Sequence, residues 1–409
     1  MKVLHIHELD IGGGAETVFN ITRKNYLVEK NYSGFINKNN YDHSDIRFKS
    51  YENYNFILRP FFYVFSINNY IQLNKFLKIN NVDIIHLHGF IGSLSSSILL
   101  ALRFHKKRNT IKIVQTFHDF HIACPNSLLF DYKKEIICEK CLGKKIKLKM
   151  LTTSCERRGY FYTILKSVRS FVANNLLNHK KIIDKFIAPS NLMKQKLIED
   201  KIEEEKISLL RNPILLNEIK YEKKSDIITY YGRISKEKNI YFILDAFNEW
   251  KIKSNNNFKL FIIGDGDEKN SIEKYAINLK FNKDIVFYNF KEEKELFDIL
   301  KEVKYLFMAS KLYENAPMTL LESISLNILP IVPDLGGMKE TVQDVFQFGK
   351  IYEKNNIESF IEQIEEMETE YLSELEKLIK RKSFLFENYG VEVYYKNLFN
   401  IYSDLLNKN

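Results

Sequence analysis

The feature that most constrains the fold is an alternation of short apolar runs with amphipathic helical stretches along nearly the whole chain. Each run is rich in Ile, Val, Leu or aromatic residues and ends in small or polar residues. Parallel strands are buried on both faces and need crossover helices of this length. The chain is therefore predicted to be α/β, with parallel sheets covered by helices on both sides.

The strands fall into two successive sets, which predicts two domains for a chain of 409 residues. The first set is expected at Val3–His7, Gly34–Asn37, Asp83–His88, Lys112–His118, Lys185–Pro189 and Lys206–Leu210. The second set is expected at Ile227–Tyr231, Lys259–Ile263, Asp284–Tyr288, Tyr305–Met308 and Pro330–Val332. The helices expected between the strands include Glu16–Glu29 in the first set and Glu293–Leu300 in the second. We place the domains at 1–212 and 213–388, with a charged linker at 220–226 and an aromatic-rich C-terminal helix within 389–409.

The composition is that of a soluble globular protein, with 45% hydrophobic and 28% charged residues. We find no apolar run of the roughly 18 residues that a membrane helix needs. Glu8 stands where a signal peptide would have its apolar run, so we expect no secretory export and a cytoplasmic location.

The net charge of +9 is concentrated in one segment. Thirteen Lys or Arg and three acids lie between Lys133 and Lys181, and aromatic and aliphatic residues are interleaved with them. Such a segment favours contact with an anionic membrane surface or an acidic ligand. The alternatives are a solvated helix face with a flexible loop, or a nucleic-acid-binding surface.

Three motifs follow predicted strands, at the sheet edge where parallel sheets bind ligands. Gly12-Gly13-Gly14-Ala15-Glu16 precedes a helix and is either a ligand loop or a simple turn, because its glycines let a backbone approach a ligand and the helix start attracts anions. It is not the G-x-G-x-x-G dinucleotide motif, since position 17 is Thr.

The second motif holds Arg233 and Lys238 between a strand and a helix. Two cations there can hold a diphosphate, or they can belong to a solvated basic turn. The third motif places Glu314 and Glu322 eight residues apart across a helix start at Pro317. Carboxylates so placed can accept hydrogen bonds from sugar or ribose hydroxyls, or they can lie on a capped surface helix.

Taken together, these motifs resemble glycosyltransferase family 4. The resemblance rests on G-G-x-E near the start, G-R-x4-K, Ile262-Ile263-Gly264-Asp265-Gly266, E-x7-E and the run Pro330–Gly337. It spans nearly the whole chain, with the motifs in the family's order. It implies a GT-B fold, with two Rossmann-like domains facing across a cleft and a final helix that crosses back to the first domain. The chain departs from the family at Asn315-Ala316-Pro317, where many members have Gly-Phe-Gly.

The resemblance also implies roles for individual residues. Arg233 and Lys238 would neutralise the diphosphate of a nucleotide-sugar without a catalytic metal. Glu314 would bind the transferred sugar, Glu322 the ribose, and His118 would approach the sugar from the first domain. The remaining substrate-binding residues would be Gly12 and Gly13 near the phosphates, Gly264, Asp265 and Gly266 near the base, and Asn315, Ala316, Met318, Thr319 and Leu320 along the sugar and phosphates.

The histidines and cysteines raise the question of a metal. A metal site at His118-Asp119-Phe120-His121 is less expected than a hydrogen-bonding role for His118. The four cysteines, Cys124, Cys138, Cys141 and Cys155, follow the pattern C-x13-C-x2-C-x13-C inside an insertion at about 120–180. This spacing favours a structural zinc site, with free thiols or redox pairs as the alternatives. Metal analysis that finds no zinc, with four reactive thiols in the native protein, would refute it.

The resulting hypothesis is a retaining transferase of hexose type that acts in surface-polysaccharide synthesis and needs no cofactor for catalysis. Its partners would be a nucleotide diphosphate-sugar, a glycan acceptor that is lipid-linked at the inner face of the membrane, and no nucleic acid. One rival is a GT-B nucleotide-sugar epimerase. A rival of another class is a zinc-bound basic module that binds nucleic acid, which predicts salt-sensitive binding and leaves the two glutamates unexplained.

Overall fold

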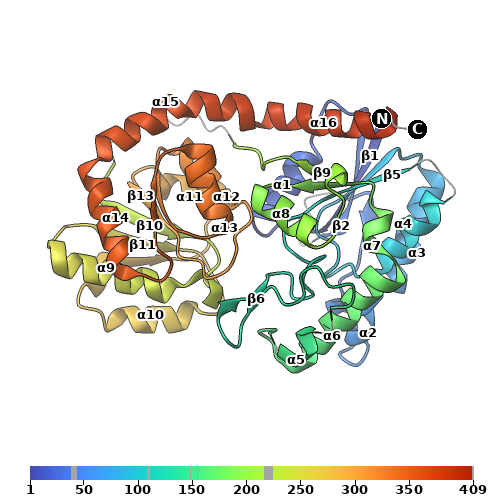
Figure 1. Cartoon of the computed structure of the whole chain (residues 1–409), viewed down its shortest axis with the longest axis horizontal. Coiled ribbons are helices and arrows are strands. Elements are labelled where there is room, and N and C mark those ends of the chain that lie inside the picture. Colours follow the sequence, from blue (N-terminus) through green and yellow to red (C-terminus); the bar gives the residue numbers. More distant parts are fainter. Residues whose placement is uncertain (38–43, 108–110, 148, 154, 216–223, 408–409) are drawn as a thin grey trace. The chain divides into compact units, whose positions relative to one another are not determined.

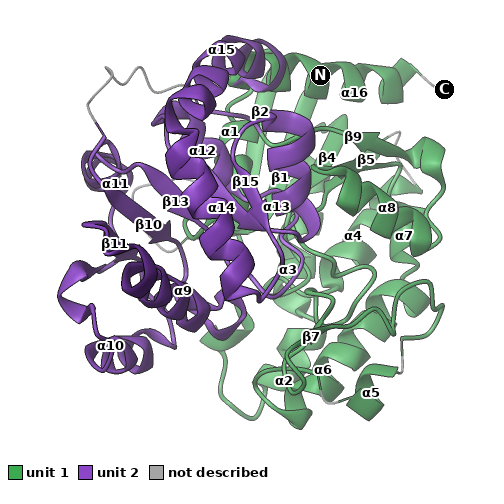
Figure 2. Ribbon diagram, turned by 60° about the vertical axis from the view of Figure 1, so that its left-hand side comes forward, with its two compact units in different colours: residues 1–212, 391–409 green, residues 213–390 purple. Residues whose placement is uncertain are grey.

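The computed structural model describes residues 1–37, 44–107, 111–147, 149–153, 155–215 and 224–407 (Figure 1). The chain forms two compact units, which Figure 2 shows in two colours. Unit 1 comprises residues 1–212 and 391–409, and unit 2 comprises residues 213–390. Of the predicted linker at 220–226, residues 220–223 lie outside the described part of the chain.

The described part of unit 1 holds a seven-stranded parallel sheet in the order β3-β2-β1-β4-β5-β8-β9. Its strands are β1 (Lys2–Leu9), β2 (Lys30–Ile36), β3 (Ile46–Arg47), β4 (Ile84–Leu87), β5 (Lys112–Thr116), β8 (Lys185–Ala188) and β9 (Ile207–Leu209). The central strands β4, β5 and β8 are almost fully buried, as expected for a parallel sheet.

The helices of unit 1 are α1 (Gly14–Thr22), α2 (Arg59–Val64), α3 (Ile67–Ile79), α4 (Ser97–Lys106), α5 (Lys149–Thr153), α6 (Tyr160–Phe171), α7 (His179–Ile182), α8 (Asn191–Glu199) and α16 (Val391–Asn407). A short antiparallel hairpin, β6 (Phe130–Asp131) with β7 (Ile136–Ile137), lies in the insertion. Short 3-10 helices, η1 (Tyr51–Asn53) and η3 (Glu204–Lys206), and a π-helical turn, η2 (Val172–Leu176), complete the unit.

The described part of unit 2 holds a six-stranded parallel sheet in the order β12-β11-β10-β13-β14-β15. Its strands are β10 (Ile227–Tyr231), β11 (Lys259–Ile263), β12 (Ile285–Tyr288), β13 (Tyr305–Phe307), β14 (Leu329–Pro333) and β15 (Lys350–Tyr352). Its helices are α9 (Ile240–Ser254), α10 (Lys269–Ile277), α11 (Glu293–Leu300), α12 (Met318–Ser325), α13 (Gly336–Glu340), α14 (Ile357–Thr369) and α15 (Tyr371–Tyr389), with short turns η4 (Lys236–Lys238), η5 (Asn282–Asp284) and η6 (Thr341–Phe346).

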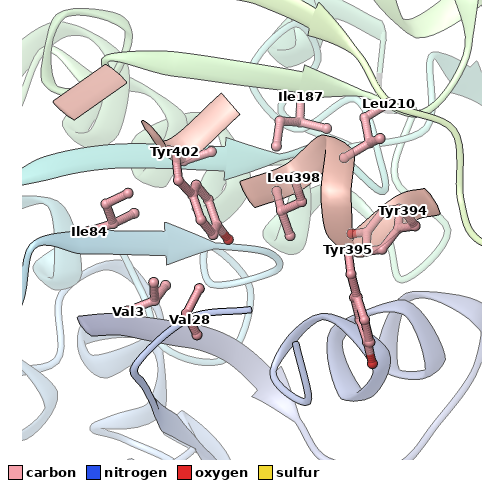
Figure 3. Packing of buried hydrophobic residues seen from close by; sticks show 10 residues of the cluster. Val3, Val28, Ile84, Ile187, Leu210, Tyr394, Tyr395, Leu398 and Tyr402 are labelled. Carbon is pink, nitrogen blue, oxygen red and sulfur yellow. The ribbon is translucent and has the colours of Figure 1, made fainter. Parts of the chain in front are cut away.

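The helix at the end of the chain, α16, belongs to unit 1 because its aromatic face completes that unit's core. Tyr394, Tyr395, Leu398 and Tyr402 are buried against residues of β1, β4, β5 and β8, among them Val3 and Ile84 (Figure 3). Burying one large apolar side chain stabilises a fold by about 1.5–3 kcal/mol. Each tyrosine hydroxyl also has a partner in unit 1: Tyr394 contacts Thr22 Oγ1 at 2.8 Å, Tyr395 donates to the Ile21 carbonyl at 2.9 Å, and Tyr402 contacts His86 Nδ1 at 2.6 Å.

No helix in the described residues combines the length and the apolar character needed to cross a bilayer.

Candidate functional site in unit 2

The carboxyl ends of three neighbouring strands bring the predicted site residues of unit 2 together. In the sheet order β11-β10-β13, the strands lead into the segments 264–266, 232–239 and 308–317 respectively. Ligands of open parallel sheets bind at this edge. Both acidic and basic site residues therefore come from adjacent loops, although Lys238 and Glu314, for example, are 76 positions apart in sequence.

The centre of the site is an ion pair between Lys238 and Glu314. Lys238 Nζ lies 2.5 Å from Glu314 Oε1, and the Ser310 hydroxyl donates to the same oxygen at 2.6 Å. Burial alone would raise the pKa of Glu314, but the charge of Lys238 and these two hydrogen bonds hold it below its usual value. Glu314 is therefore ionised at neutral pH and fixed in one orientation.

Arg233 lies on the same loop as Lys238 and is more exposed. Its Nη2 donates to Glu237 Oε1 at 2.8 Å, and 57% of its side chain remains accessible to solvent. Glu237 is itself only 1% exposed, so it anchors one edge of the guanidinium from below. Arg233 can therefore offer its accessible face to an anion while Glu237 holds it in place.

Two glycines, Gly264 and Gly266, let the loops at this edge approach one another. A Cβ on Gly264 would lie 1.9 Å from the Gly232 carbonyl oxygen, and one on Gly266 would lie 2.0 Å from that of Ile234. Gly232 and Gly264 also have φ values of +142° and +146°, which other residues rarely adopt. The glycines at 264 and 266 are therefore needed for loop packing, whatever they bind.

Gly337 has the same effect on the loop that carries Glu314. Its amide donates to the Glu314 carbonyl at 2.8 Å, and a Cβ at this position would lie 1.8 Å from the Asn315 carbonyl oxygen. The start of α13 thus supports the backbone of the Glu314 loop directly.

The helix α12 begins after Pro317, as the sequence predicts, and Met318 is its first residue. Asn315 is buried, Ala316 and Thr319 are half-buried, and the Leu320 amide donates to the Pro317 carbonyl at 3.1 Å. The Tyr231 hydroxyl donates to the Thr319 carbonyl at 2.7 Å and so ties the helix to the end of β10.

Glu322 lies further along α12 and differs electrostatically from Glu314. Burial raises its pKa to about 7, against a smaller lowering effect of a hydrogen bond with Tyr231. Sequence reasoning found Glu314 and Glu322, gave no individual role to Tyr231 and Gly337 although both lie in its motifs, and missed Ser310. Tyr231 ends a strand and Ser310 follows one, so the rule that polar residues at strand ends build sites could have found both.

The predicted unit 1 residues

In unit 1, Gly12 and Gly13 lie beside a carboxylate of their own chain. The Gly13 amide donates to Glu16 Oε2 at 2.7 Å, and His7 Nε2 lies 3.3 Å from Glu16 Oε1. Burial favours the neutral form of Glu16, but these partners lower its pKa to about 2. Glu16 therefore caps α1 as an anion, so the amide of Gly13 is already engaged.

His118 follows β5 and lies, half-buried, beside a cluster of buried imidazoles. Its Nε2 lies 3.0 Å from His88 Nδ1, and the two rings are stacked with centroids 5.3 Å apart. Burial is the main cause that lowers the pKa of His118 to about 3. His118 is therefore a neutral ring at physiological pH, suited to hydrogen bonding rather than to carrying charge.

The same cluster contains the one group of three or more His, Cys, Asp or Glu in the described residues whose ligand atoms all lie within 4.8 Å of one another: His5, His86 and His88. Both nitrogens of His86 are already bonded, to Tyr402 and Thr116. The nitrogens that lack a partner are His5 Nδ1 and His88 Nε2. Two such atoms are fewer than the ligands of a structural zinc site, so we interpret the cluster as a buried polar layer under α16.

None of the four cysteines of the insertion forms a disulfide in the structure. Cys124, Cys141 and Cys155 are buried and Cys138 is half-buried. Burial is the largest cause that raises the pKa of Cys141 to about 12 and that of Cys155 to about 11, and neighbouring cysteines add to both shifts. The four thus lie in one region, although no three of these sulfurs are within 4.8 Å of one another. Zinc binding here stays a prediction.

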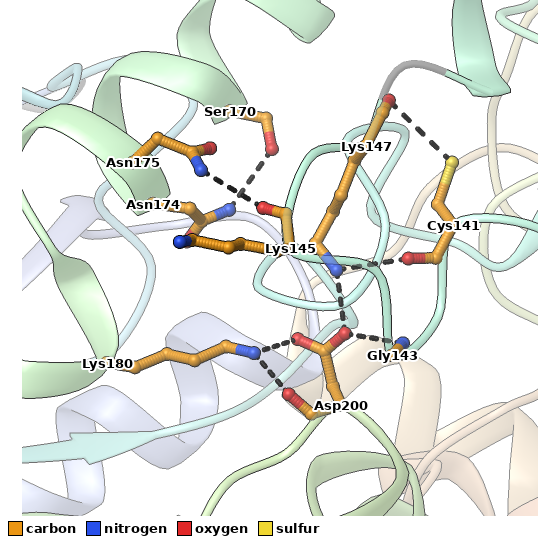
Figure 4. Close-up of polar contacts among 9 residues, drawn as sticks. All are labelled: Cys141, Gly143, Lys145, Lys147, Ser170, Asn174, Asn175, Lys180 and Asp200. Atoms are coloured by element: carbon orange, nitrogen blue, oxygen red, sulfur yellow. Dashed lines mark hydrogen bonds and ion pairs between the residues drawn. The ribbon is translucent and has the colours of Figure 1, made fainter.

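Several cations of the basic segment are engaged inside unit 1. The buried Asp200 accepts from Lys147 Nζ at 2.6 Å, from Lys180 Nζ at 2.7 Å and from the Gly143 amide at 2.9 Å (Figure 4). Glu156 binds Arg158 Nε at 2.9 Å and Lys166 Nζ at 2.5 Å. The segment is therefore less free to bind external anions than its composition alone suggests.

The chain is similar to known proteins in sequence and in structure. A family model described as Glycosyltransferase Family 4 matches residues 40–218, and one described as Glycosyl transferases group 1 matches residues 213–383. Lipopolysaccharide 1,6-galactosyltransferase of Escherichia coli K12 is 28% identical over 201 residues, which are 45% of this chain and 54% of that protein. The chain spans about half the length of this curated relative.

Two solved structures cover almost the whole chain. The lipopolysaccharide outer core galactosyltransferase WaaB, in its apo form, has a TM-score of 0.64 at 19% identity and covers 99% of this chain and 100% of its own. Anabaena Alr3699/HepE, in complex with UDP-glucose, has a TM-score of 0.67 at 12% identity, with 99% and 100% coverage. These similarities confirm the predicted GT-B fold.

Proposed function

Because the chain belongs to the glycosyltransferases, with a family 4 domain followed by a group 1 domain, we propose that it transfers a sugar from a nucleotide diphosphate-sugar to a glycan acceptor. The observation that carries the proposal is the Lys238–Glu314 pair at the carboxyl edge of the unit 2 sheet, with Arg233 on the same loop. This edge combines two cations that can bind a diphosphate with an oriented carboxylate that can bind sugar hydroxyls.

In the proposed reaction, the bond between the anomeric carbon and the diphosphate oxygen breaks while a bond to an acceptor hydroxyl oxygen forms. The acceptor proton passes to the departing phosphate, and attack from the same face retains the anomeric configuration. Lys238 and Arg233 stabilise the negative charge that develops on the leaving diphosphate. The positive charge that stabilises the leaving group thus comes from side chains, and no step is assigned to a metal.

The other predicted residues keep their roles as proposals. Glu314 binds the transferred sugar, Glu322 binds the ribose, and the neutral His118 is a hydrogen-bonding partner for the sugar. The segments Gly264–Gly266 and Asn315–Leu320 border the base, sugar and phosphates. The structure of Alr3699/HepE with UDP-glucose makes a uridine nucleotide the first donor to test, and the name of the lipopolysaccharide galactosyltransferase makes a lipid-linked glycan the first acceptor.

Thermal stability measured with UDP, GDP and ADP tests the proposal. We expect one of the three to raise the melting temperature, and product analysis with the matching nucleotide-sugars then identifies the donor. Stabilisation by none of them, together with salt-sensitive DNA binding, would instead favour the nucleic-acid-binding alternative. Interconversion of two nucleotide-sugars without transfer would favour the epimerase.

Glu322 gives the proposal a pH signature. Its raised pKa means that the folded protein binds a proton that the unfolded chain releases near the usual glutamate value, so this group reduces stability as the pH rises from about 4.5 towards 7. Binding of ribose hydroxyls by a carboxylate requires the ionised form. We therefore expect the affinity for UDP to rise up to about tenfold between pH 6 and pH 8.

Glu322→Gln is the matched control for this measurement. The amide does not titrate, so the variant should lose the part of the pH dependence that belongs to Glu322 and keep the part that belongs to UDP itself. Calorimetric titration at several pH values checks both proteins, and identical pH profiles would contradict the assignment.

We also propose that unit 1 docks on an anionic membrane, and α6 supports this. The face of α6 that points to solvent is apolar, with Tyr160, Phe161, Ile164, Val168 and Phe171 each 39–58% exposed. The buried face is polar and includes Thr163, Ser167, Arg169 and Ser170. This polarity is the reverse of that of an ordinary surface helix.

The surroundings of α6 add apolar and basic groups. Phe56, Ile57 and Phe61, on or next to α2, are 53–75% exposed, and α2 packs against α6. The segment 144–171 carries eight Lys or Arg and one acid, and five of these cations are exposed: Lys144, Lys145, Lys149 on the adjoining α5, and Arg157 and Arg158 before α6. An apolar helix face beside exposed cations suits the interface of an anionic bilayer.

The double substitution Phe161→Asp with Ile164→Asp is expected to lower binding to vesicles of phosphatidylcholine and phosphatidylglycerol by about tenfold or more. Co-sedimentation measures it, and Leu372→Asp, which changes a side chain that is 78% exposed on unit 2, is the control. Equal binding of the double variant and wild type would contradict the membrane assignment. So would loss of a dimer, rather than of vesicle binding, in light scattering.

A further inference from the structure

The polar face of α6 borders a cavity inside unit 1 that the proposed chemistry does not yet use. The cavity has a volume of about 220 Å³, and its lining includes Arg158, Lys166 and Arg169. Tyr51 of η1 and Tyr63 of α2 lie beside these cations. A single water needs about 10–15 Å³, so the cavity has room for a much larger group.

Arg169 is the unusual member of this lining. Arg169 is only 4% exposed, and its guanidinium lies 4.4 Å from the centre of the Tyr63 ring. In the described part of the chain Arg169 has no carboxylate partner, whereas Arg158 and Lys166 both contact Glu156. A buried cation without a countercharge costs several kcal/mol, so the site favours an anion brought from outside.

The balance of charges around Arg169 also favours an external anion. One carboxylate, Glu156, serves two cations, and Arg169 adds a third positive charge. The pKa of Lys166 is lowered, with burial as the largest cause, and the repulsion from Arg169 adds to the shift against the attraction of Glu156. Within this group of Glu156, Arg158, Lys166 and Arg169, the positive charge therefore exceeds the negative charge.

The lining also includes two carboxylates, those of Glu8 and Asp119. Glu8 Oε1 accepts the Gly92 amide at 2.5 Å, and a Cβ on Gly92 would lie 2.6 Å from the same oxygen. Asp119 Oδ1 accepts from the amide and from Nδ1 of His121, at 2.9 and 2.5 Å. Both carboxylates are thus held in place at the lining, where each can accept hydrogen bonds from hydroxyl groups.

We propose that this cavity binds a phosphate group of the acceptor, with Arg169 as its main ligand and Glu8 and Asp119 receiving the hydroxyls of the attached sugar. The planar guanidinium can bind two phosphate oxygens at once. This inference rests on the proposed function and deepens it, because it identifies the acceptor as a phosphorylated glycan. The phosphate can belong to the sugar itself or to the link between glycan and lipid.

The test is the thermal stability of the full chain, saturated with UDP, against inorganic phosphate, glucose 1-phosphate and geranyl phosphate. UDP fills the proposed nucleotide site, so that the added anions report on a second one. We expect all three to stabilise the wild type. A lower apparent Kd for glucose 1-phosphate than for geranyl phosphate assigns the group to the sugar, and the reverse order assigns it to the lipid link.

Arg169→Met keeps the contact with Tyr63 and removes the charge, so it should raise the apparent Kd for phosphate by about tenfold or more. Lys166→Met leaves Glu156 paired with Arg158 and should have a smaller effect in the same direction. Arg47→Met, at an exposed position of β3, should behave as the wild type.

Two outcomes overturn the proposal: no stabilisation of the wild type by any of the three anions, or unchanged phosphate binding in Arg169→Met. Should Arg169→Met fail to fold, the decision passes to Lys166→Met, and unchanged binding in that variant overturns the proposal. An unaltered response to UDP in the folded variants separates this site from the nucleotide site, so failure here leaves the transferase proposal standing.

Discussion

Lys238→Ala is expected to lower the rate of sugar transfer by about 100- to 1000-fold, which is the usual effect of removing one group that stabilises developing charge. Two losses combine in this variant. The departing diphosphate loses a cation, and Glu314 loses the partner that holds it 2.5 Å away and keeps its pKa low. The sugar and the leaving group are thus both affected.

The fold should survive this change. Lys238 and Glu314 are 20% and 14% exposed, and Ser310 still donates to the carboxylate in the variant, so the free energy of unfolding should fall by only about 1–3 kcal/mol. Steady-state rates with the identified donor, alongside thermal unfolding, measure both effects. Lys380→Ala, at an exposed position on α15 of the same unit, is the control. Wild-type turnover in Lys238→Ala would remove Lys238 from the site.

Gly337→Ala is expected to lower the rate of sugar transfer nearly as much as Lys238→Ala, although Gly337 has no proposed contact with substrate. The new Cβ would lie 1.8 Å from the Asn315 carbonyl oxygen and 2.6 Å from that of Glu314. Both are backbone atoms, so the loop itself must move. A displacement of about 1 Å at a catalytic group can cost 100-fold in rate, and overpacking typically costs about 1–3 kcal/mol of stability.

Gly13→Ala is the matched control for the stability arm, because its Cβ would meet only Glu16 Oε2, at 3.8 Å. Unfolding by denaturant and transfer rates on the same preparations check the prediction. A Gly337→Ala enzyme with normal stability and normal rate would show that the Glu314 loop tolerates displacement, and would weaken the role given to Glu314.

The strands and helices of unit 2 are the part of the fold that the sequence predicts best. Ile227–Tyr231, Lys259–Ile263 and Glu293–Leu300 have the bounds that their patterns predict. Each is an apolar or amphipathic run bounded by charged or small residues, which is the pattern that marks element ends. The predicted helix at 16–29 is wrong at its end, since α1 stops at Thr22 and the chain turns before β2.

Other elements have a sequence pattern that is too short or too weak to predict them. The strand β3 and the hairpin β6–β7 are two residues long, which is shorter than any periodicity can reveal. The helix α3 has three Asn and a weak apolar face, and it is held by partners distant in sequence: Asn69 bonds to Lys49 and to the Leu94 carbonyl. Long-range hydrogen bonds of this kind are not visible in a local pattern.

The candidate site likewise has features that the local sequence predicts and features that it does not. The pairing of Lys238 with Glu314 joins loops 76 residues apart, so only the family resemblance, not the residues alone, suggests that they meet. For α6 the sequence gives an amphipathic helix but not its direction, because periodicity separates two faces without saying which one is buried. The apolar face of α6 is the exposed one, and the cavity beside its polar face has no counterpart in the sequence pattern.

The position of α16 has a consequence for biosynthesis. The chain leaves unit 1 at Asn212, forms all of unit 2, and supplies the last layer of the first core only with its final seventeen-residue helix. During translation α16 is therefore synthesised after the whole of unit 2, and Val3 and Ile84 gain their packing partners on this helix only then. A fusion partner or a truncation at the C-terminus acts on the fold of the opening residues, almost four hundred positions away.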